Sequence, residues 1–278
     1  MTIRVVTDST CDLPAGTIEK YGIKVLPLYI NVGEREYLDG IDITREEFYE
    51  KLPDFPTHPT TAVPSPMKFK AIYDALAEDG ATEIISIHIS ETLSAMVNVA
   101  RAAAQETLSA VIHVIDGGQL SLGTGFLVER AAELAAKGSP MDEIIEALNS
   151  QMRRTHVFAA LDTLEFLKRS GRMNRWVSNL GSLLQIKPIL TMHDGKPGNE
   201  RVRTREKAMQ KVVEMLTAVG RIERVALVHT HAPQRIAELK QMAAHLLPKA
   251  DLMTQDITPV IGAHIGPGAA GFAVVSAE

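Results

Sequence analysis

The chain has 278 residues, of which 45% are hydrophobic and 23% are charged, a composition typical of a soluble globular protein. This length suffices for two domains of ordinary size. A formal net charge of −5 argues against nucleic-acid binding as the main role, because that role requires a basic face. Cys11 is the only cysteine, so an intramolecular disulfide and a cysteine-based zinc site are both excluded.

Neither end of the chain carries the pattern of a membrane or export segment. The sequence runs from Met1 directly into a strand-and-turn pattern, without the apolar stretch of an export signal. We therefore expect a cytoplasmic protein. The longest uncharged stretch, residues 258–277, contains four glycines and two prolines. This composition favours loops between short strands over a membrane-spanning helix.

Short apolar runs alternate with longer amphipathic runs in the first half of the chain, as in a protein built from βα units. Thr44, with Glu47 three residues later, predicts a capping box at a helix start. Ser65 before Pro66, and Ser139 before Pro140, predict two further helix starts. Strands are predicted at residues 3–6, 24–30, 83–87 and 111–115, and helices at 13–21, 66–77, 95–108 and 120–136.

The second half is organised differently, around an expected hairpin with Asp194 and Gly195 at its tip. A polar stretch at residues 151–155 predicts a boundary between two α/β domains, residues 1–155 and 156–278. Strands are predicted at residues 157–161, 186–192, 200–204, 224–229, 252–257 and 272–275, with a basic turn at 168–172 and a helix at 205–219.

Small polar residues gather at four points where a strand is expected to end or a helix to begin. The segments are residues 7–10, 60–65, 90–94 and 116–121. Ligands of α/β sheets collect at such points, and helix N-termini there favour anions. A capped helix would explain each segment alone. Four of them in one half of the chain predict a shared crevice lined with hydroxyl groups.

Several common chemistries lack their sequence signature. The Gly-Lys-Ser/Thr triplet of a phosphate loop is absent. Gly123 and Gly125 lie inside a helical pattern without the third glycine of a dinucleotide fingerprint, and Ser94 lacks the Gly-x-Ser-x-Gly pattern of a serine hydrolase. His229 and His231 have no adjacent carboxylate and give only a weak metal signal. We therefore predict neither a metal site nor a cofactor.

His264 stands out because Gly266-Pro267-Gly268 follows it closely. Such a turn lets the backbone approach a ligand. A histidine there can donate a hydrogen bond to a carboxylate or phosphate, and its charge can change near neutral pH. It can equally complete the hydrogen bonds of a loop, and the residues alone leave both interpretations open.

Taken together, these motifs resemble the DegV family, and the resemblance spans nearly the whole chain. No single motif is decisive, but their order and spacing are specific. The matching segments are residues 7–14, 37–42, 61–65, 90–94, 116 with 121–125, 167–172, 187–190 with 194–195, and 264–268.

The resemblance implies a two-domain DegV-like α/β fold. An N-terminal Rossmann-like parallel sheet with flanking helices and a C-terminal α/β domain would hold a long-chain fatty acid between them. The protein would be a non-catalytic lipid-binding subunit in phospholipid metabolism. It would present the fatty-acid carboxylate to a separate ATP-dependent, dihydroxyacetone-kinase-like fatty acid kinase, which makes acyl phosphate. Transient membrane contact stays open.

The resemblance also assigns residues to this role. The carboxylate-binding residues would be Thr61, Ser94 and His264. Arg172 matches an arginine near the pocket mouth, where positive charge would help to dock the kinase or stabilise the phosphate. Asp39 is a candidate for orienting His264. The supporting residues of the expected site are Arg172, Asp39, Gly266 and Gly268.

The sequence departs from the family pattern beside these expected contacts. Ala62 and Val63 replace the usual Ser-Gln, and Ala95 and Met96 replace the usual Gly-Thr. The neighbours of the expected contacts thus become more apolar or bulkier, and Met96 is expected to narrow the pocket.

A competing hypothesis uses the same pocket for catalysis. Because a serine and a histidine are expected to share it, Ser94 as nucleophile and His264 as base would make the protein a hydrolase or acyltransferase acting on an acyl ligand.

Overall fold

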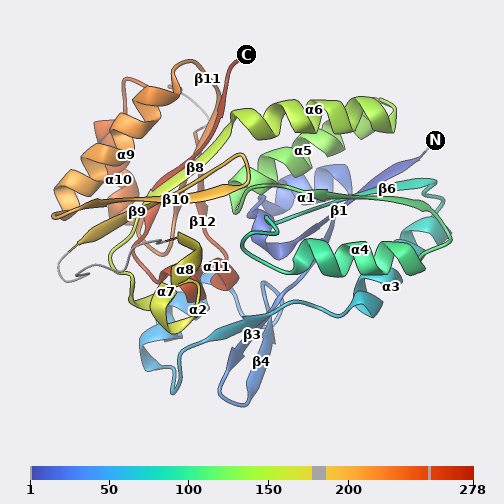
Figure 1. Cartoon of the computed structure of the whole chain (residues 1–278), viewed down its shortest axis with the longest axis horizontal. Helices are drawn as coiled ribbons and strands as arrows, with labels where there is room; N and C mark the ends of the chain where they lie inside the picture. The colour runs from blue at the N-terminus through green and yellow to red at the C-terminus, as the bar shows by residue number, and fades with distance from the viewer. Residues whose placement is uncertain (1, 177–185, 250–251) are drawn as a thin grey trace.

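The computed structural model describes residues 2–176, 186–249 and 252–278 and has a mixed α/β architecture (Figure 1). The strands are β1 (Ile3–Asp8), β2 (Lys24–Leu26), β3 (Tyr29–Val32), β4 (Arg35–Leu38), β5 (Thr60–Ala62), β6 (Glu83–His88), β7 (Val111–Asp116), β8 (Thr155–Ala160), β9 (Lys187–His193), β10 (Lys196–Val202), β11 (Ile222–His229), β12 (Met253–Asp256) and β13 (Ala270–Ser276). The helices are α1 (Ala15–Tyr21), α2 (Arg45–Lys51), α3 (Pro66–Glu78), α4 (Met96–Glu106), α5 (Leu122–Ala136), α6 (Met141–Arg154), α7 (Glu165–Arg169), α8 (Met173–Trp176), α9 (Arg205–Val219), α10 (Pro233–Met242) and α11 (Pro259–Ile265), with short 3-10 turns at Ser9–Cys11 and Leu52–Asp54.

The N-terminal half forms a parallel sheet in the order β2-β1-β6-β7. Its central strands are apolar on both faces, as expected for a parallel sheet covered by helices. Val5 and Ile85 pack in one core cluster with α5, whereas Val6 and Ile84 pack in another with α3 and α4. The predicted parallel sheet with flanking helices is therefore confirmed.

The C-terminal half forms a six-stranded mixed sheet in the order β10-β9-β8-β13-β11-β12. Residues alternate between its two faces along each strand. Val157 and Val228 face the cluster that contains α5, while Phe158 and Leu227 face a cluster with α9 and α10. Figure 1 shows α9 and α10 on the outer side of this sheet.

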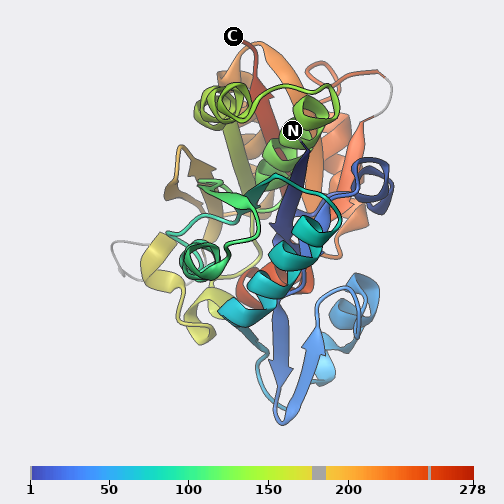
Figure 2. The ribbon, with the colours of Figure 1, turned by 90° about the vertical axis from the view of Figure 1, so that its right-hand side faces the viewer.

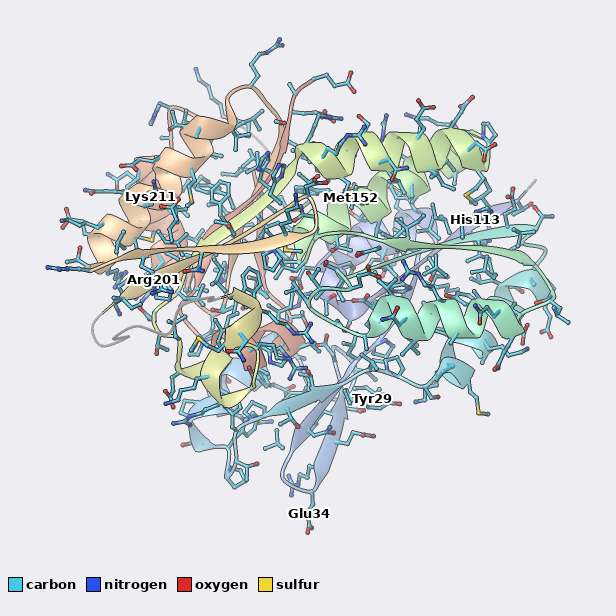
Figure 3. All side chains as sticks on the ribbon, in the orientation of Figure 1. Tyr29, Glu34, His113, Met152, Arg201 and Lys211 are labelled. Carbon is cyan, nitrogen blue, oxygen red and sulfur yellow. The ribbon has the colours of Figure 1, made fainter. Side chains whose placement is uncertain are left out.

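A small antiparallel sheet, β4-β3-β5, completes the fold. The β3–β4 hairpin projects from the lower side of the molecule in both views (Figures 1 and 2), and Glu34 at its tip points outward (Figure 3). Strand β5 pairs with β3 so that Thr61 lies opposite Ile30. This pairing places residues 60–62 beside helix α11, which also contacts β3 and β5.

Most of the predicted elements are confirmed, including α9 at residues 205–219 and the capping box of Thr44 and Glu47 at α2. The single strand predicted at residues 24–30 is wrong. It is two strands in different sheets, and the break includes Pro27, which has no N–H for a strand ladder. Strands β4 and β5 were not predicted. The helix expected to start after Ser139 begins at Met141, with Pro140 as its N-cap.

The expectation of loops between short strands at residues 258–277 is also wrong in part. Residues 259–265 form helix α11, and His264 lies in its last turn. Thr258 caps the helix by accepting a hydrogen bond from the backbone N–H of Val260, and Pro259 occupies the first turn, where proline is well tolerated. Strand β13 then fills most of the remaining stretch.

The division into domains at residue 155 stays a prediction. The parallel sheet draws its strands from residues 3–116 and the six-stranded sheet from residues 155–276. However, one hydrophobic cluster combines Val5 and Leu127 with Val157 and Ala273, so the two halves share a core. Within the described ranges, no helix is long and apolar enough to cross a membrane.

A substitution at Gly266 would test the role of the backbone turn that ends α11. The φ of Gly266 is +74°, and a Cβ atom there would overlap the ring of Phe166. We expect Gly266→Ala to lower the free energy of unfolding by about 3 kcal/mol, because its φ of 74° and ψ of 174° form a conformation adopted almost only by glycine, and overpacking adds to that strain. Gly138 is the control, since its φ is +80° and a Cβ atom there would meet nothing within 4 Å. Gly138→Ala should cost about 1 kcal/mol, and equal losses in chemical denaturation would contradict the role of Phe166.

Candidate ligand-binding site

A cavity of about 450 Å³ lies where segments from both halves of the chain meet. Each of the four polar segments noted in the sequence contributes to its wall, so the expected shared crevice exists. Figure 1 places α7, α8 and α11 close together below the six-stranded sheet. The lining residues are Thr10, Leu28, Thr61, Ala62, Val63, Ile89, Leu93, Ser94, Ala95, Leu120, Leu167, Arg172, Arg175, Trp176, Val260, Ile261, His264 and Ile265.

Most of this wall is hydrocarbon. Leucine, isoleucine, valine and tryptophan side chains account for much of the lining, and polar side chains form the minority. A mostly apolar cavity with a few convergent polar groups is the usual form of a small-molecule site. Such a wall suits a ligand with a long apolar body and a polar head.

His264 and Thr61 are in direct contact inside this cavity. The Nε2 atom of His264 lies 2.9 Å from the hydroxyl oxygen of Thr61, although 203 residues separate them in the sequence. Thr61 comes from strand β5 and His264 from helix α11, so the contact depends on the packing of α11 against β5. The Nδ1 atom of His264 is buried and has no hydrogen-bond partner within the described residues.

The imidazole of His264 is held in its neutral form. Burial, followed by the positive charges of Arg172, His58 and Arg175, lowers its pKa from 6.5 to about 3. A neutral imidazole carries one N–H donor and one acceptor nitrogen. It can therefore form hydrogen bonds to the polar group of a ligand without adding a positive charge to the site. The same low pKa makes it a weak base at neutral pH.

Two guanidinium groups supply positive charge beside His264. Arg172 donates to the backbone carbonyl of Ser170 at 2.8 Å, and Arg175 donates to the carbonyl of Thr92. Neither forms an ion pair with a carboxylate among the described residues. Burial and the neighbouring Arg175 lower the pKa of Arg172. This local excess of positive charge favours an anionic ligand group.

Ser94 lines the same cavity from the loop after β6. Its hydroxyl oxygen accepts a hydrogen bond from the backbone N–H of Met96 at 3.3 Å, and its hydrogen is available to a further acceptor. No hydrogen bond joins Ser94 to His264 in the described part of the chain. The structure thus brings Thr61, Ser94 and His264 to one cavity without assembling a nucleophile–base pair.

Asp39 does not contact His264 through any described hydrogen bond. It lies at the other end of α11, where it accepts a hydrogen bond from the hydroxyl of Thr258, the N-cap residue. Burial raises the pKa of Asp39, although the hydrogen bonds with Ser9 and Thr258 act to lower it. Any influence of Asp39 on His264 therefore passes through the position of the helix.

Gly266 and Gly268 shape the turn after α11 and do not line the cavity. The N–H of Gly266 donates to Gly262 at 2.8 Å, and its carbonyl accepts from the hydroxyl of Thr230 at 2.8 Å. The N–H of Gly268 donates to the carbonyl of Thr230 at 2.7 Å. The two glycines therefore fix the end of α11 rather than approach a ligand.

Of the residues that depart from the family pattern, three line the cavity and one lies in the protein core. Ala62, Val63 and Ala95 line the cavity and make it more apolar. Met96 is fully buried in the core cluster that contains α3 and α4, and it is absent from the lining. The expectation that Met96 narrows the pocket is therefore wrong, because the first residue of α4 points into the core.

A buried Ser-His-Asp arrangement was not predicted from the sequence. His88 lies 2.9 Å from Asp8 through Nδ1 and 2.7 Å from Ser86 through Nε2. Ser86 also accepts a hydrogen bond from Tyr73 at 2.8 Å. These side chains are buried and do not line the cavity. Thr10, which donates a hydrogen bond to Asp8, does line it. The arrangement satisfies buried polar groups and offers no accessible nucleophile.

The only sequence feature that points to this network is the position of two of its residues just after the ends of predicted strands. Asp8 and His88 end the neighbouring parallel strands β1 and β6, but the sequence does not say which strands are neighbours. In the part of the chain that the structure describes, no group of three or more His, Cys, Asp or Glu side chains could hold a metal ion.

The fold and the cavity define a mixed α/β protein with an internal apolar site that ends in hydroxyls, a neutral imidazole and two guanidiniums. A family profile described as "Uncharacterised protein, DegV family" matches residues 2–277. The chain belongs to the DegV family. A DegV domain-containing protein of Streptomyces coelicolor is 35% identical over 99% of this chain and 98% of its own length.

Two solved structures are similar over their whole length. "Fatty Acid Binding of a DegV family Protein from Thermus thermophilus" matches with a TM-score of 0.90 and 35% identity, covering 100% of both chains. "Crystal Structure of DegV, a fatty acid binding protein from Bacillus subtilis" matches with a TM-score of 0.91 and 30% identity, also covering 100% of both chains. The DegV-like fold inferred from the sequence is confirmed.

The neutral state of His264 leads to a prediction on stability. Because its pKa is lower in the folded protein than in the unfolded chain, the unfolded chain takes up more protons as the pH falls below about 6.5. Stability is therefore present above that pH and lost on acidification towards the folded value. Between about pH 7 and about pH 5, the lipid-free protein should lose about 1–2 kcal/mol more than a His264→Gln variant.

The measurement is the free energy of unfolding by denaturant at several pH values. His245, an exposed histidine, provides the control for the loss of a histidine side chain, since His245→Gln should leave the free energy of unfolding at pH 7 nearly unchanged. If His264→Gln follows the unchanged protein at every pH, His264 is not a buried neutral group.

Proposed function

We propose that this protein binds a long-chain fatty acid, with the carboxylate at Thr61, Ser94 and His264 and the acyl chain along the apolar wall. One observation carries the proposal. A single cavity of about 450 Å³ combines these three side chains with a mainly hydrocarbon lining and with two guanidiniums that pair with no carboxylate among the described residues. Few ligand classes match both a long apolar wall and one cationic, hydroxyl-bearing region.

The energetics of the two parts of the ligand differ. Burying a carboxylate without hydrogen bonds would cost several kcal/mol, so the head requires donors. The hydroxyl of Ser94, the one donor that the hydrogen-bonded pair of Thr61 and His264 has left, and the positive charge of Arg172 and Arg175 supply them. Each buried methylene contributes about 0.8 kcal/mol. A chain of roughly sixteen carbons would therefore supply most of the affinity, and the head would set the orientation.

The comparisons support the same ligand class. The relatives from Thermus thermophilus and Bacillus subtilis are both described as fatty-acid binding, and both align with the whole of this chain. The residues of this chain that match the family motif also meet in one cavity. The proposal thus combines a family property with a site built from this chain's own side chains.

We further propose that the bound acid is presented to a separate ATP-dependent fatty acid kinase, which would form acyl phosphate in the cytoplasm. Arg172 and Arg175 support this step, because phosphorylation adds negative charge next to their guanidiniums. A kinase of the dihydroxyacetone-kinase-like class should consume ATP only with the loaded protein. Equal consumption with free fatty acid alone would contradict this partnership.

Catalysis by Ser94 and His264 is the weaker candidate. A base whose pKa is lowered to about 3 is poorly matched to proton transfer near pH 7. The partner of its Nε2 atom is Thr61 rather than Ser94. We therefore assign these residues to binding, with the chemistry performed by the partner protein.

The direct test is organic extraction of the purified protein followed by mass spectrometry. We expect a long-chain fatty acid in roughly equimolar amount. Thr61→Val removes the hydroxyl but keeps the shape, and it should weaken binding about tenfold, as the loss of one or two hydrogen bonds to a charged group predicts.

Thr60→Val is the matched control, because neighbouring strand residues point to opposite sides and Thr60 is exposed and absent from the cavity wall. This variant should bind as the unchanged protein does. A protein that carries no fatty acid and takes up neither palmitate nor oleate would refute the proposed function.

A further inference from the structure

A second, smaller cavity of about 30 Å³ lies directly behind the main one. The two cavities have four lining residues in common: Leu120, Trp176, Ile261 and Ile265. Among the described residues, these four side chains border both spaces. The rear cavity therefore adjoins the main cavity along these shared residues.

The walls of the two cavities differ in their chemistry. Thr61, Ser94, His264, Arg172 and Arg175 line the main cavity alone. The rear cavity lies against the inner face of the six-stranded sheet. The strand residues that line it include Val157 and Ala159 of β8, Met192 of β9 and Val228 of β11.

The polar residues of the rear wall offer little to a ligand. Thr191 lies opposite Phe158 in the β8–β9 pair, and Phe158 packs in the cluster on the other face of the sheet. Ser121 donates its hydroxyl hydrogen to Asp12 at 2.6 Å, so it is not available to a ligand. Protein interiors contain few voids larger than a water molecule, and a void with an apolar lining stays dry. A space of about 30 Å³ in such a position fits about two carbon atoms, since about 10–15 Å³ holds one water.

We propose that the rear cavity receives the methyl end of the acyl chain, so that Val228 and its neighbours set the longest fatty acid that the protein accepts. This inference rests on the proposed function. The polar groups hold the head in the main cavity, and the chain runs past Trp176 and Ile261 towards β11. An acid that is too short leaves the rear cavity empty, and one that is too long meets the sheet.

Each methylene that gains burial is worth about a fourfold increase in affinity. Filling the rear cavity with two carbons should therefore raise affinity by about fifteenfold over an acid that stops short of it. Beyond that length the affinity should stop rising, because the closed sheet offers no further space.

The test varies the size of residue 228 and measures affinities for saturated straight-chain acids from laurate to arachidate. Val228→Ile adds one methylene to the rear wall. It should weaken the longest well-bound acid by about fourfold, leave the shortest acids unchanged, and raise the melting temperature of the lipid-free protein by filling a void. Val228→Ala should extend the accepted length.

Val225→Ile is the matched control, since Val225 lies on the same strand but packs in the opposite cluster with α9 and α10. It should leave the length profile unchanged. If the dependence of affinity on chain length does not change with residue 228, or changes equally with residue 225, the inference is overturned, while fatty-acid binding itself is not contradicted. If the unchanged protein binds no acid of any length, the proposed function fails and this inference fails with it.

Discussion

Thr258, at the N-terminus of α11, is held by two buried carboxylates that come from the other end of the chain. Its backbone N–H donates to Asp12 at 2.9 Å, and its hydroxyl donates to Asp39. Arg45 lies 3.1 Å from Asp12 and offsets part of the charge. Burial nevertheless raises the pKa of Asp12 to about 6. Buried charges persist only when they are paired and hydrogen-bonded, so these contacts fix where α11 enters the N-terminal half.

The cavity depends on that junction. Helix α11 contributes Val260, Ile261, His264 and Ile265 to the main wall, and two of these residues also bound the rear cavity. One short helix thus presents a neutral imidazole and the apolar side chains that would guide an acyl chain. Thr61 on β5 meets His264 only because the same helix packs against β5. The carboxylate cluster at one end of α11 and the glycine turn at the other together hold this arrangement.

The sequence was sufficient for elements whose information is local. The 3.6-residue periodicity predicted α9, and the spacing of Thr44 and Glu47 predicted the cap of α2. The prediction for residues 258–277 is wrong in part because Gly262 weakens a helical pattern. The structure explains the glycine, since a Cβ at position 262 would overlap Tyr49. The contact between position 262 and Tyr49 joins residues far apart in the sequence, so the hydrophobic periodicity of the segment cannot reveal it.

The candidate site shows the same limit. The four polar segments indicated a shared crevice, whereas the joining of Thr61 and His264 was suggested by family resemblance alone. Which strands pair, and therefore that Asp8 meets His88, depends on long-range packing. The direction of Met96 also depends on it, because its side chain points into the core from the first residue of α4.

The polar region of the cavity should recognise a carboxylate rather than any polar head group. The most direct measurement compares the affinities of palmitate and hexadecanol, which share the chain length and differ in the head group. Palmitate should bind at least about a hundredfold more tightly, because charge-assisted hydrogen bonds from hydroxyls, imidazole and guanidiniums are lost with the alcohol. Equal affinities would mean that the cavity holds only a hydrocarbon chain, and would contradict the assignment of Thr61, Ser94 and His264.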